Sequence, residues 1–168
     1  PLGKKRMETI DEEVTNASLN YLDKRKADGK PFFLGWNSTR MHINTYLKPA
    51  SVGKTGLGVY PDGMVEHDAM VGQLLDKLKA LGLEENTVVV YASDQGWMGG
   101  QNGMWGMGDY FRPTGAHELM MQIPLIFRQP GSIPAGQSSD IIVSNYDFMP
   151  TVLSQLGLAA KMPAKPAS

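Results

Sequence analysis

Two short groups of residues carry side chains that could do chemistry. Asp94-Gln95-Gly96 directly follows an apolar run, and a carboxylate beside an amide oxygen is a pair of hard ligands suited to calcium or magnesium. His42 follows another apolar run, two residues after Arg40, so an imidazole and a guanidinium there could bind an oxyanion and move a proton. Taken alone, each group also has an ordinary explanation, because Ser-Asp-Gln-Gly is common turn chemistry and many loop histidines have no role.

The elements that must position these residues are predicted to alternate between helices and strands. The predicted helices are residues 9–27, a helix marked by apolar residues 71–81, and residues 147–156; the predicted strands are 31–36, 87–92 and 124–127. Such alternation indicates an α/β fold with a mainly parallel sheet flanked by helices, and the strand at 87–92 should be buried on both faces. In such a sheet His42 and Asp94 would lie on the same rim, at the carboxyl ends of the strands. Three or four strands are few, so the chain is expected to be part of a larger fold.

The remaining segments leave more than one interpretation open. Residues 37–58 have no sustained period and are predicted to form a long loop, which in a compact domain is usually functional. The glycine-rich residues 96–108 could form a lid or a ligand wall, or their Met and Trp side chains could pack against the core. His67 is expected to pack within the second helix or face solvent, and His117 beside Glu118 to form a structural pair.

Composition narrows the classes of function. A formal net charge of -1 gives no global field for nucleic acid or an anionic membrane, and no apolar run approaches the roughly 20 residues of a membrane span. With no cysteine, disulfides, thiolate metal sites and a cysteine nucleophile are excluded in this sequence. No secretory signal is visible, and the localisation is left open. We therefore expect no nucleic-acid or membrane partner.

Five segments in order resemble the type I sulfatases (arylsulfatases) of the alkaline-phosphatase-like superfamily. They are residues 31–42, 56–68, 87–96, 123–131 and 143–152. The resemblance implies a partial alkaline-phosphatase/sulfatase-like fold, with residues 1–158 forming the C-terminal part of a catalytic domain and residues 159–168 a disordered tail. The family hydrolyses sulfate esters and is often periplasmic or secreted.

The resemblance also implies roles for individual residues. His42 matches the histidine that contacts the sulfate or the leaving-group oxygen. Asp94 and Gln95 match the Asp-Asn pair that binds Ca2+ (or Mg2+), since glutamine keeps the amide oxygen. The implied mechanism is metal-assisted attack by a hydrated formylglycine on sulfur, with cationic groups stabilising the developing charge. The implied substrate is the sulfate ester of a small molecule or a glycan.

Several departures from the family pattern bear on activity. The C/S-x-P-x-R motif that yields the formylglycine nucleophile is absent from the sequence, as is the N-terminal aspartate pair of the metal site. Asn102 stands in the place of a family histidine and Met107 in that of a lysine, for which Arg112 could substitute. Asn102 and Arg112 are therefore predicted anion contacts, and this chain alone is expected to be inactive as a sulfatase.

Two alternatives remain open. Superfamily relatives with the same metal-site layout cleave phosphate esters, so a metal-dependent phosphodiesterase or esterase is one of them. The other is a non-catalytic remnant that self-associates through exposed strand edges and apolar faces. The expected partner is thus a second copy of the chain or a missing N-terminal half.

Overall fold

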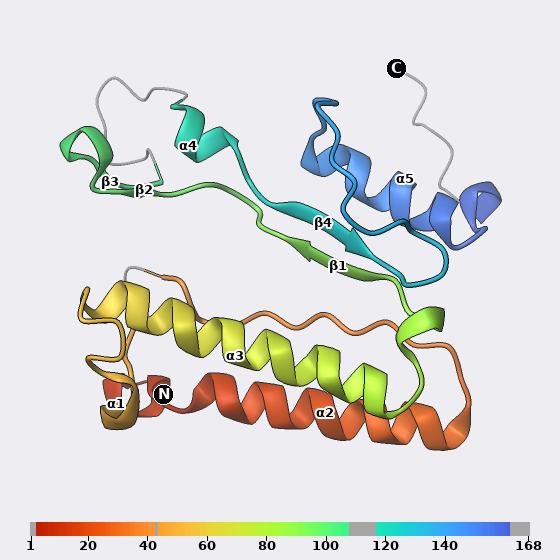
Figure 1. Cartoon of the computed structure of the whole chain (residues 1–168), viewed down its shortest axis with the longest axis horizontal. Helices are drawn as coiled ribbons and strands as arrows, with labels where there is room; N and C mark the ends of the chain where they lie inside the picture. The colour runs from red at the N-terminus through yellow and green to blue at the C-terminus, as the bar shows by residue number, and fades with distance from the viewer. Residues whose placement is uncertain (1–2, 43, 108–116, 162–168) are drawn as a thin grey trace. The chain divides into compact units, whose positions relative to one another are not determined.

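The computed structural model describes residues 3–42, 44–107 and 117–161 (Figure 1). The chain divides into two compact units. Unit 1 comprises residues 1–91 and 126–133, and unit 2 comprises residues 92–125 and 134–168. Each unit is described by itself.

Two long helices form the body of unit 1. After the short helix α1 (Lys4–Met7), α2 (Ile10–Asp28) ends at Gly29, whose φ of 63° is the left-handed conformation that glycine adopts freely. Helix α3 (Val59–Ala80) lies alongside α2 (Figure 1). The seam between them buries apolar side chains of both helices and of the intervening loop: Leu22, Leu47, Met70 and Leu78. The first predicted helix is confirmed, and the second begins much earlier than its apolar pattern suggested.

Residues 31–36 are extended but form no strand, so the prediction of a buried strand there is wrong. Every second side chain is half-buried: Phe32 packs edge-on against Tyr21, and Trp36 donates from Nε1 to Thr15 Oγ1 (3.1 Å). The other positions, Phe33 among them, are exposed. The alternation has the period of a strand, but a strand also needs a hydrogen-bonded neighbour.

The expected mainly parallel sheet is not seen in the part of the chain that the structure describes. Strand β1 (Val89–Ala92) pairs with β4 (Leu125–Arg128), and the two run in opposite directions (Figure 1). The side chains of both strands are half-buried or exposed, so the prediction that the strand at residues 87–92 is buried on both faces is also wrong. An apolar run indicates that a strand could be buried. Whether it is buried depends on neighbouring segments, which come from elsewhere in the chain.

The described part of unit 2 contains a hairpin and two α-helices. Strands β2 (Met98–Gly99) and β3 (Trp105–Gly106) pair antiparallel, joined by the 3-10 turn η3 (Gln101–Gly103). Helix α4 (Glu118–Met121) precedes β4, and α5 (Asn145–Gln155) begins with a capping box of Ser144 and Asp147. The last predicted helix is therefore confirmed, with Ser144 rather than Asp147 as the N-cap.

Short 3-10 turns complete the described chain: η1 (Pro49–Ser51), η2 (Glu84–Asn86) and η4 (Ala159–Lys161). The tail predicted to be disordered comprises residues 159–168. Its first three residues form η4, and residues 162–168 lie outside the described residues. No helix in the described ranges is both long and apolar enough to cross a membrane.

Candidate functional site

His42 lies in the loop that follows the extended segment of unit 1, with its side chain exposed. The backbone N–H of Asn44 donates to its Nδ1 (3.2 Å), and the Thr45 hydroxyl donates to its backbone oxygen (2.6 Å). Because Nδ1 accepts a hydrogen bond, the proton of the neutral imidazole is on Nε2. The loop therefore presents an N–H donor at Nε2, the geometry needed to contact an anionic oxygen.

Arg40 does not share this exposure, so the expectation of an oxyanion held jointly by Arg40 and His42 is wrong. The Arg40 side chain is completely buried and pairs with Asp11 (Nη1 to Oδ2, 3.0 Å) and Glu66 (Nη2 to Oε2, 2.8 Å). Asp11 in turn accepts from the backbone N–H (2.7 Å) and the hydroxyl (2.9 Å) of Thr39. The guanidinium is thereby fully committed to tying the His42 loop to α2 and α3.

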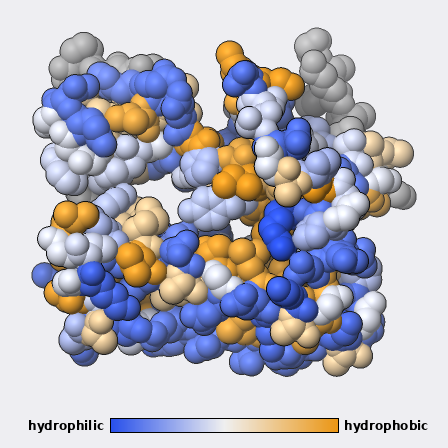
Figure 2. All heavy atoms as spheres, in the orientation of Figure 1, coloured by the Kyte–Doolittle hydropathy of each residue, from blue (hydrophilic) through white to orange (hydrophobic). Residues whose placement is uncertain are grey.

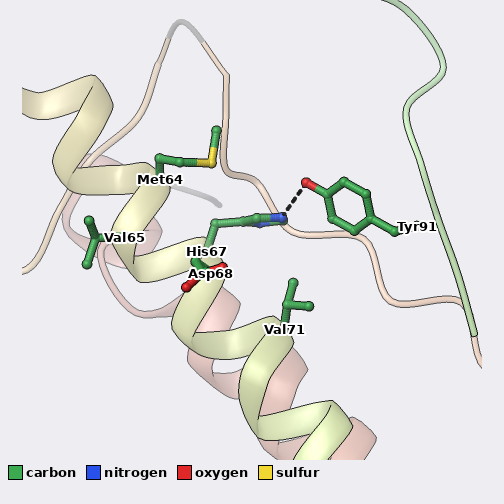
Figure 3. Close-up of a pocket in the computed structure, with 6 residues that line it drawn as sticks. All are labelled: Met64, Val65, His67, Asp68, Val71 and Tyr91. Atoms are coloured by element: carbon green, nitrogen blue, oxygen red, sulfur yellow. Dashed lines mark hydrogen bonds between the residues drawn. The ribbon is translucent and has the colours of Figure 1, made fainter. Parts of the chain in front are cut away.

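His67, set aside as a packing residue in the sequence, is the centre of a hydrogen-bonded cluster in unit 1. Its Nδ1 lies 2.9 Å from Ser38 Oγ, which itself donates to the Arg40 backbone oxygen (2.7 Å). With that proton committed, Ser38 must accept from Nδ1–H, which leaves Nε2 to accept from the Tyr91 hydroxyl (3.4 Å, Figure 3). Burial lowers the pKa of His67, and this effect outweighs the negative charges of Asp11 and Asp68, which raise the pKa.

This arrangement defines what the cluster can do. His67 and Tyr91 face an open pocket of about 340 Å³ whose other walls are mainly apolar (Figure 3). Because Ser38 gives its proton to a backbone oxygen, it is not activated as a nucleophile by His67. The cluster instead holds the backbone just before His42. Sequence spacing gave no sign of it, since Ser38 and His67 are 29 residues apart.

The long predicted loop is fastened by a buried carboxylate at the start of α3. Asp62 accepts from the Thr55 hydroxyl (2.7 Å), the Thr55 N–H (2.8 Å) and the Gly53 N–H (2.6 Å). These hydrogen bonds, that of the Thr55 hydroxyl foremost, lower the pKa of Asp62. The loop between residues 49 and 58 is thus a defined structure.

Asp94 and Gln95 lie in unit 2, in a turn directly after β1, with exposed side chains. The turn is held from both sides: Asn145 Nδ2 donates to the Asp94 backbone oxygen (2.9 Å), and Gly96 N–H donates to the Met120 oxygen (3.0 Å). A Cβ on Gly96 would lie 2.6 Å from the Met120 Cα, so only glycine fits this close approach.

Asp94 and Gln95 offer the oxygen ligands that a hard cation prefers, but they are too few to hold one alone. The Asp94 carboxylate makes no hydrogen bond to another described residue, while the Gln95 amide nitrogen contacts Met107 Sδ. No group of three or more His, Asp or Glu side chains that could hold a metal occurs within residues 3–42, 44–107 and 117–161. Asp94 and Gln95 would supply two of the six to eight oxygens that calcium takes.

The remaining predicted anion contacts are Asn102 and Arg112. Asn102 is exposed at the tip of the β2–β3 hairpin with φ of 54°, a left-handed conformation that asparagine tolerates well. This backbone position is a structural reason for asparagine there. Arg112 lies outside the described residues. His42 belongs to unit 1, and Asp94, Gln95 and Asn102 belong to unit 2.

Comparisons with known proteins place the chain in a family. The sulfatase family model matches residues 2–158. The chain is 34% identical over 149 residues to N-acetylgalactosamine-6-sulfatase of the dog, Canis lupus familiaris, covering 84% of this chain and 28% of that protein. It is 33% identical over 138 residues to human steryl-sulfatase, covering 76% of this chain and 23% of that protein.

Solved structures agree with the sequence relatives. The crystal structure of the PsFucS1 sulfatase from Pseudoalteromonas sp. superimposes with a TM-score of 0.77 at 26% identity, covering 95% of this chain and 32% of that one. The chain therefore spans about a quarter to a third of the length of the relatives it matches. Its fold is that of part of a sulfatase, and the chain belongs to the sulfatase family.

Proposed function

We propose that this chain supplies part of the active site of a sulfate ester hydrolase. In this proposal His42 contacts a sulfate or leaving-group oxygen, and Asp94 and Gln95 hold a calcium or magnesium ion. The observation that carries it is the state of His42, whose Nδ1 accepts the Asn44 N–H so that Nε2–H is exposed and ready to donate. Family membership supplies the reaction class.

The chain's own residues would bind and orient rather than attack. Nε2–H of His42 would donate to an ester or sulfate oxygen, strengthening as negative charge develops there. Bound to Asp94 and Gln95, the metal ion would offset negative charge on the sulfate oxygens. Asn102 and Arg112 are further proposed anion contacts. The nucleophile motif is absent from this sequence, so we expect no turnover of an aryl sulfate by the chain alone.

The substrate class we favour is a sulfated glycan. The similarity to an N-acetylgalactosamine-6-sulfatase supports it, although the similarity to a steryl-sulfatase is of the same size. Hydrolysis of phosphodiesters in the presence of metal, without hydrolysis of sulfate esters, would favour the phosphodiesterase alternative instead.

Calorimetric titration with calcium and magnesium tests the metal half of the proposal. We expect a saturable binding heat that disappears in Asp94→Ala and persists in Asp140→Ala, a matched loss of an exposed carboxylate in the same unit. No binding heat in the unaltered chain, or equal loss in both variants, would contradict the metal assignment.

A pair of substitutions tests His42. Glutamine places an amide N–H near the position of Nε2, whereas asparagine places it near Nδ1. We expect His42→Gln to retain more aryl-sulfate binding than His42→Asn, as measured by NMR titration. The same pair can be assayed for turnover after the chain is combined with a separately expressed sulfatase segment that carries the C/S-x-P-x-R motif. Equal behaviour of the two variants would argue against a donor role at Nε2.

Self-association is the second candidate function, and one observation favours it. Unit 2 exposes a run of large apolar side chains before and within α5: Ile141 is 76%, Ile142 97% and Tyr146 92% exposed. Figure 2 shows hydrophobic residues among polar ones on the molecular surface. Sedimentation velocity should reveal a concentration-dependent oligomer that Ile142→Lys weakens, and a strictly monomeric chain at high concentration would refute this function.

A further inference from the structure

The extended segment of residues 31–36 in unit 1 has the alternation of a strand without the pairing of one. Its even-numbered side chains are half-buried and its odd-numbered positions are exposed. Its backbone N–H and C=O groups form no hydrogen bond with any other residue that the structure describes. Because an extended segment cannot satisfy these groups internally, as a helix does, they need either a neighbouring strand or water. Both edges of the segment are therefore open to a further strand.

The residue types of this segment do nothing to prevent pairing with another strand. Natural edge strands are usually protected by charged side chains, by proline within the strand or by a covering loop. Residues 31–36 include no charged residue, and the proline is Pro31, the first position, where a missing N–H does not interrupt a strand. The aromatic side chain of Phe33 is 80% exposed. Such a segment fits a partner that adds a strand to it.

A mainly apolar pocket lies beside the end of the segment, within the same unit. The ring of Trp36 contacts that of His67, with centroids 5.4 Å apart. His67 in turn lines the open pocket of about 340 Å³, whose apolar walls include Met64 and Val71 (Figure 3). When a partner adds a strand, its backbone supplies affinity, and pockets for its alternate side chains supply specificity. This pocket provides such a position for an apolar side chain of the added strand.

The share of its relatives that the chain covers indicates where the added strand comes from. The chain has the fold of part of a sulfatase and spans about a quarter to a third of the relatives it matches. A second copy of the chain would duplicate this part of the fold and would not supply the rest. We propose that one strand of the remaining part of a sulfatase fold pairs with residues 31–36 and places an apolar side chain in the pocket beside His67. This pairing does not depend on the roles proposed for His42, Asp94 and Gln95.

Co-expression tests the proposal on the whole chain. The tagged chain is produced together with the portion of the PsFucS1 sulfatase that lies outside the matched region, and amide hydrogen exchange is measured in the purified complex. Because successive N–H groups of a strand point to opposite edges, one added strand should slow exchange of every second amide of residues 32–36 by about tenfold, the equivalent of one net hydrogen bond. Failure to form a complex, or unchanged exchange throughout the segment, would overturn the proposal. Protection that arises in the chain alone and rises with its own concentration would show pairing with a second copy, and would also overturn it.

Three lysine substitutions at exposed positions locate the contact without disturbing the buried core. Phe33→Lys removes an aromatic side chain that would lie beside the added strand, and it should speed dissociation of the purified complex by about fivefold. Met64→Lys, at the pocket wall, should speed dissociation in the same way. The matched control is Leu57→Lys, because Leu57 is 78% exposed and lies in the loop before α3, away from the segment and the pocket. An unchanged rate in Phe33→Lys or Met64→Lys, or an equal increase in Leu57→Lys, would overturn the proposal.

Discussion

Replacing Arg40 with methionine tests the idea that a buried ion network fixes the loop that carries His42. The substitution keeps much of the side-chain volume but leaves Asp11 and Glu66 buried without a cation, since their side chains are 1% and 4% exposed. Removing one partner of a buried ion pair costs about 3–5 kcal/mol. Set against about 5–15 kcal/mol for a whole domain, this loss would leave unit 1 marginal. The expected fall in Tm is about 6–20 °C.

Urea unfolding followed by circular dichroism measures this change in the free energy of unfolding. The matched control is Lys77→Met, which breaks the exposed pair with Asp23 (2.6 Å) and should cost at most about 1 kcal/mol. Adding Asp11→Asn and Glu66→Gln to Arg40→Met should recover part of the loss, because the uncompensated charges are then gone. If Arg40→Met costs no more than Lys77→Met, the reasoning is refuted.

Three further predictions concern the loops around the candidate site. Because the Thr55 hydrogen bonds lower the pKa of Asp62, its contribution to stability is complete above the pKa of an unfolded aspartate and is lost as pH falls through the lower native pKa. Asp62→Asn should therefore reduce stability at neutral pH and flatten the acid dependence of the urea midpoint; an unchanged profile would contradict this. Gly96→Ala should cost about 1–3 kcal/mol, since its Cβ would meet a backbone atom 2.6 Å away. Gly99→Ala, whose nearest neighbour is 3.7 Å away, is the control and should cost less. Asn102→Gly should leave stability unchanged or raise it by up to about 1 kcal/mol, because glycine adopts φ of 54° without strain; a clear loss in urea unfolding would indicate a side-chain contact instead.

Local signals in the sequence predicted the helices and the positions of the strands β1 and β4, but not which segments pair with one another. The extent of α2 and the existence of α3 and α5 follow from spacing and end signals such as Gly29, because a helix satisfies its own backbone hydrogen bonds. Residues 31–36 have the composition of a strand but lack a partner. The pairing of β1 with β4 joins segments more than thirty residues apart, which no local pattern specifies.

The same distinction between local pattern and tertiary contact applies to the candidate site. The sequence by itself determined the family, through five ordered segments that the family match over residues 2–158 confirms, and it singled out His42, Asp94 and Gln95, whose roles stay predictions. Only the tertiary structure decided that Arg40 is buried between Asp11 and Glu66 rather than exposed to an anion. The physical reason is that the charge state and partners of a side chain depend on residues brought together from distant parts of the chain, whereas residue type and spacing record only what is near in sequence.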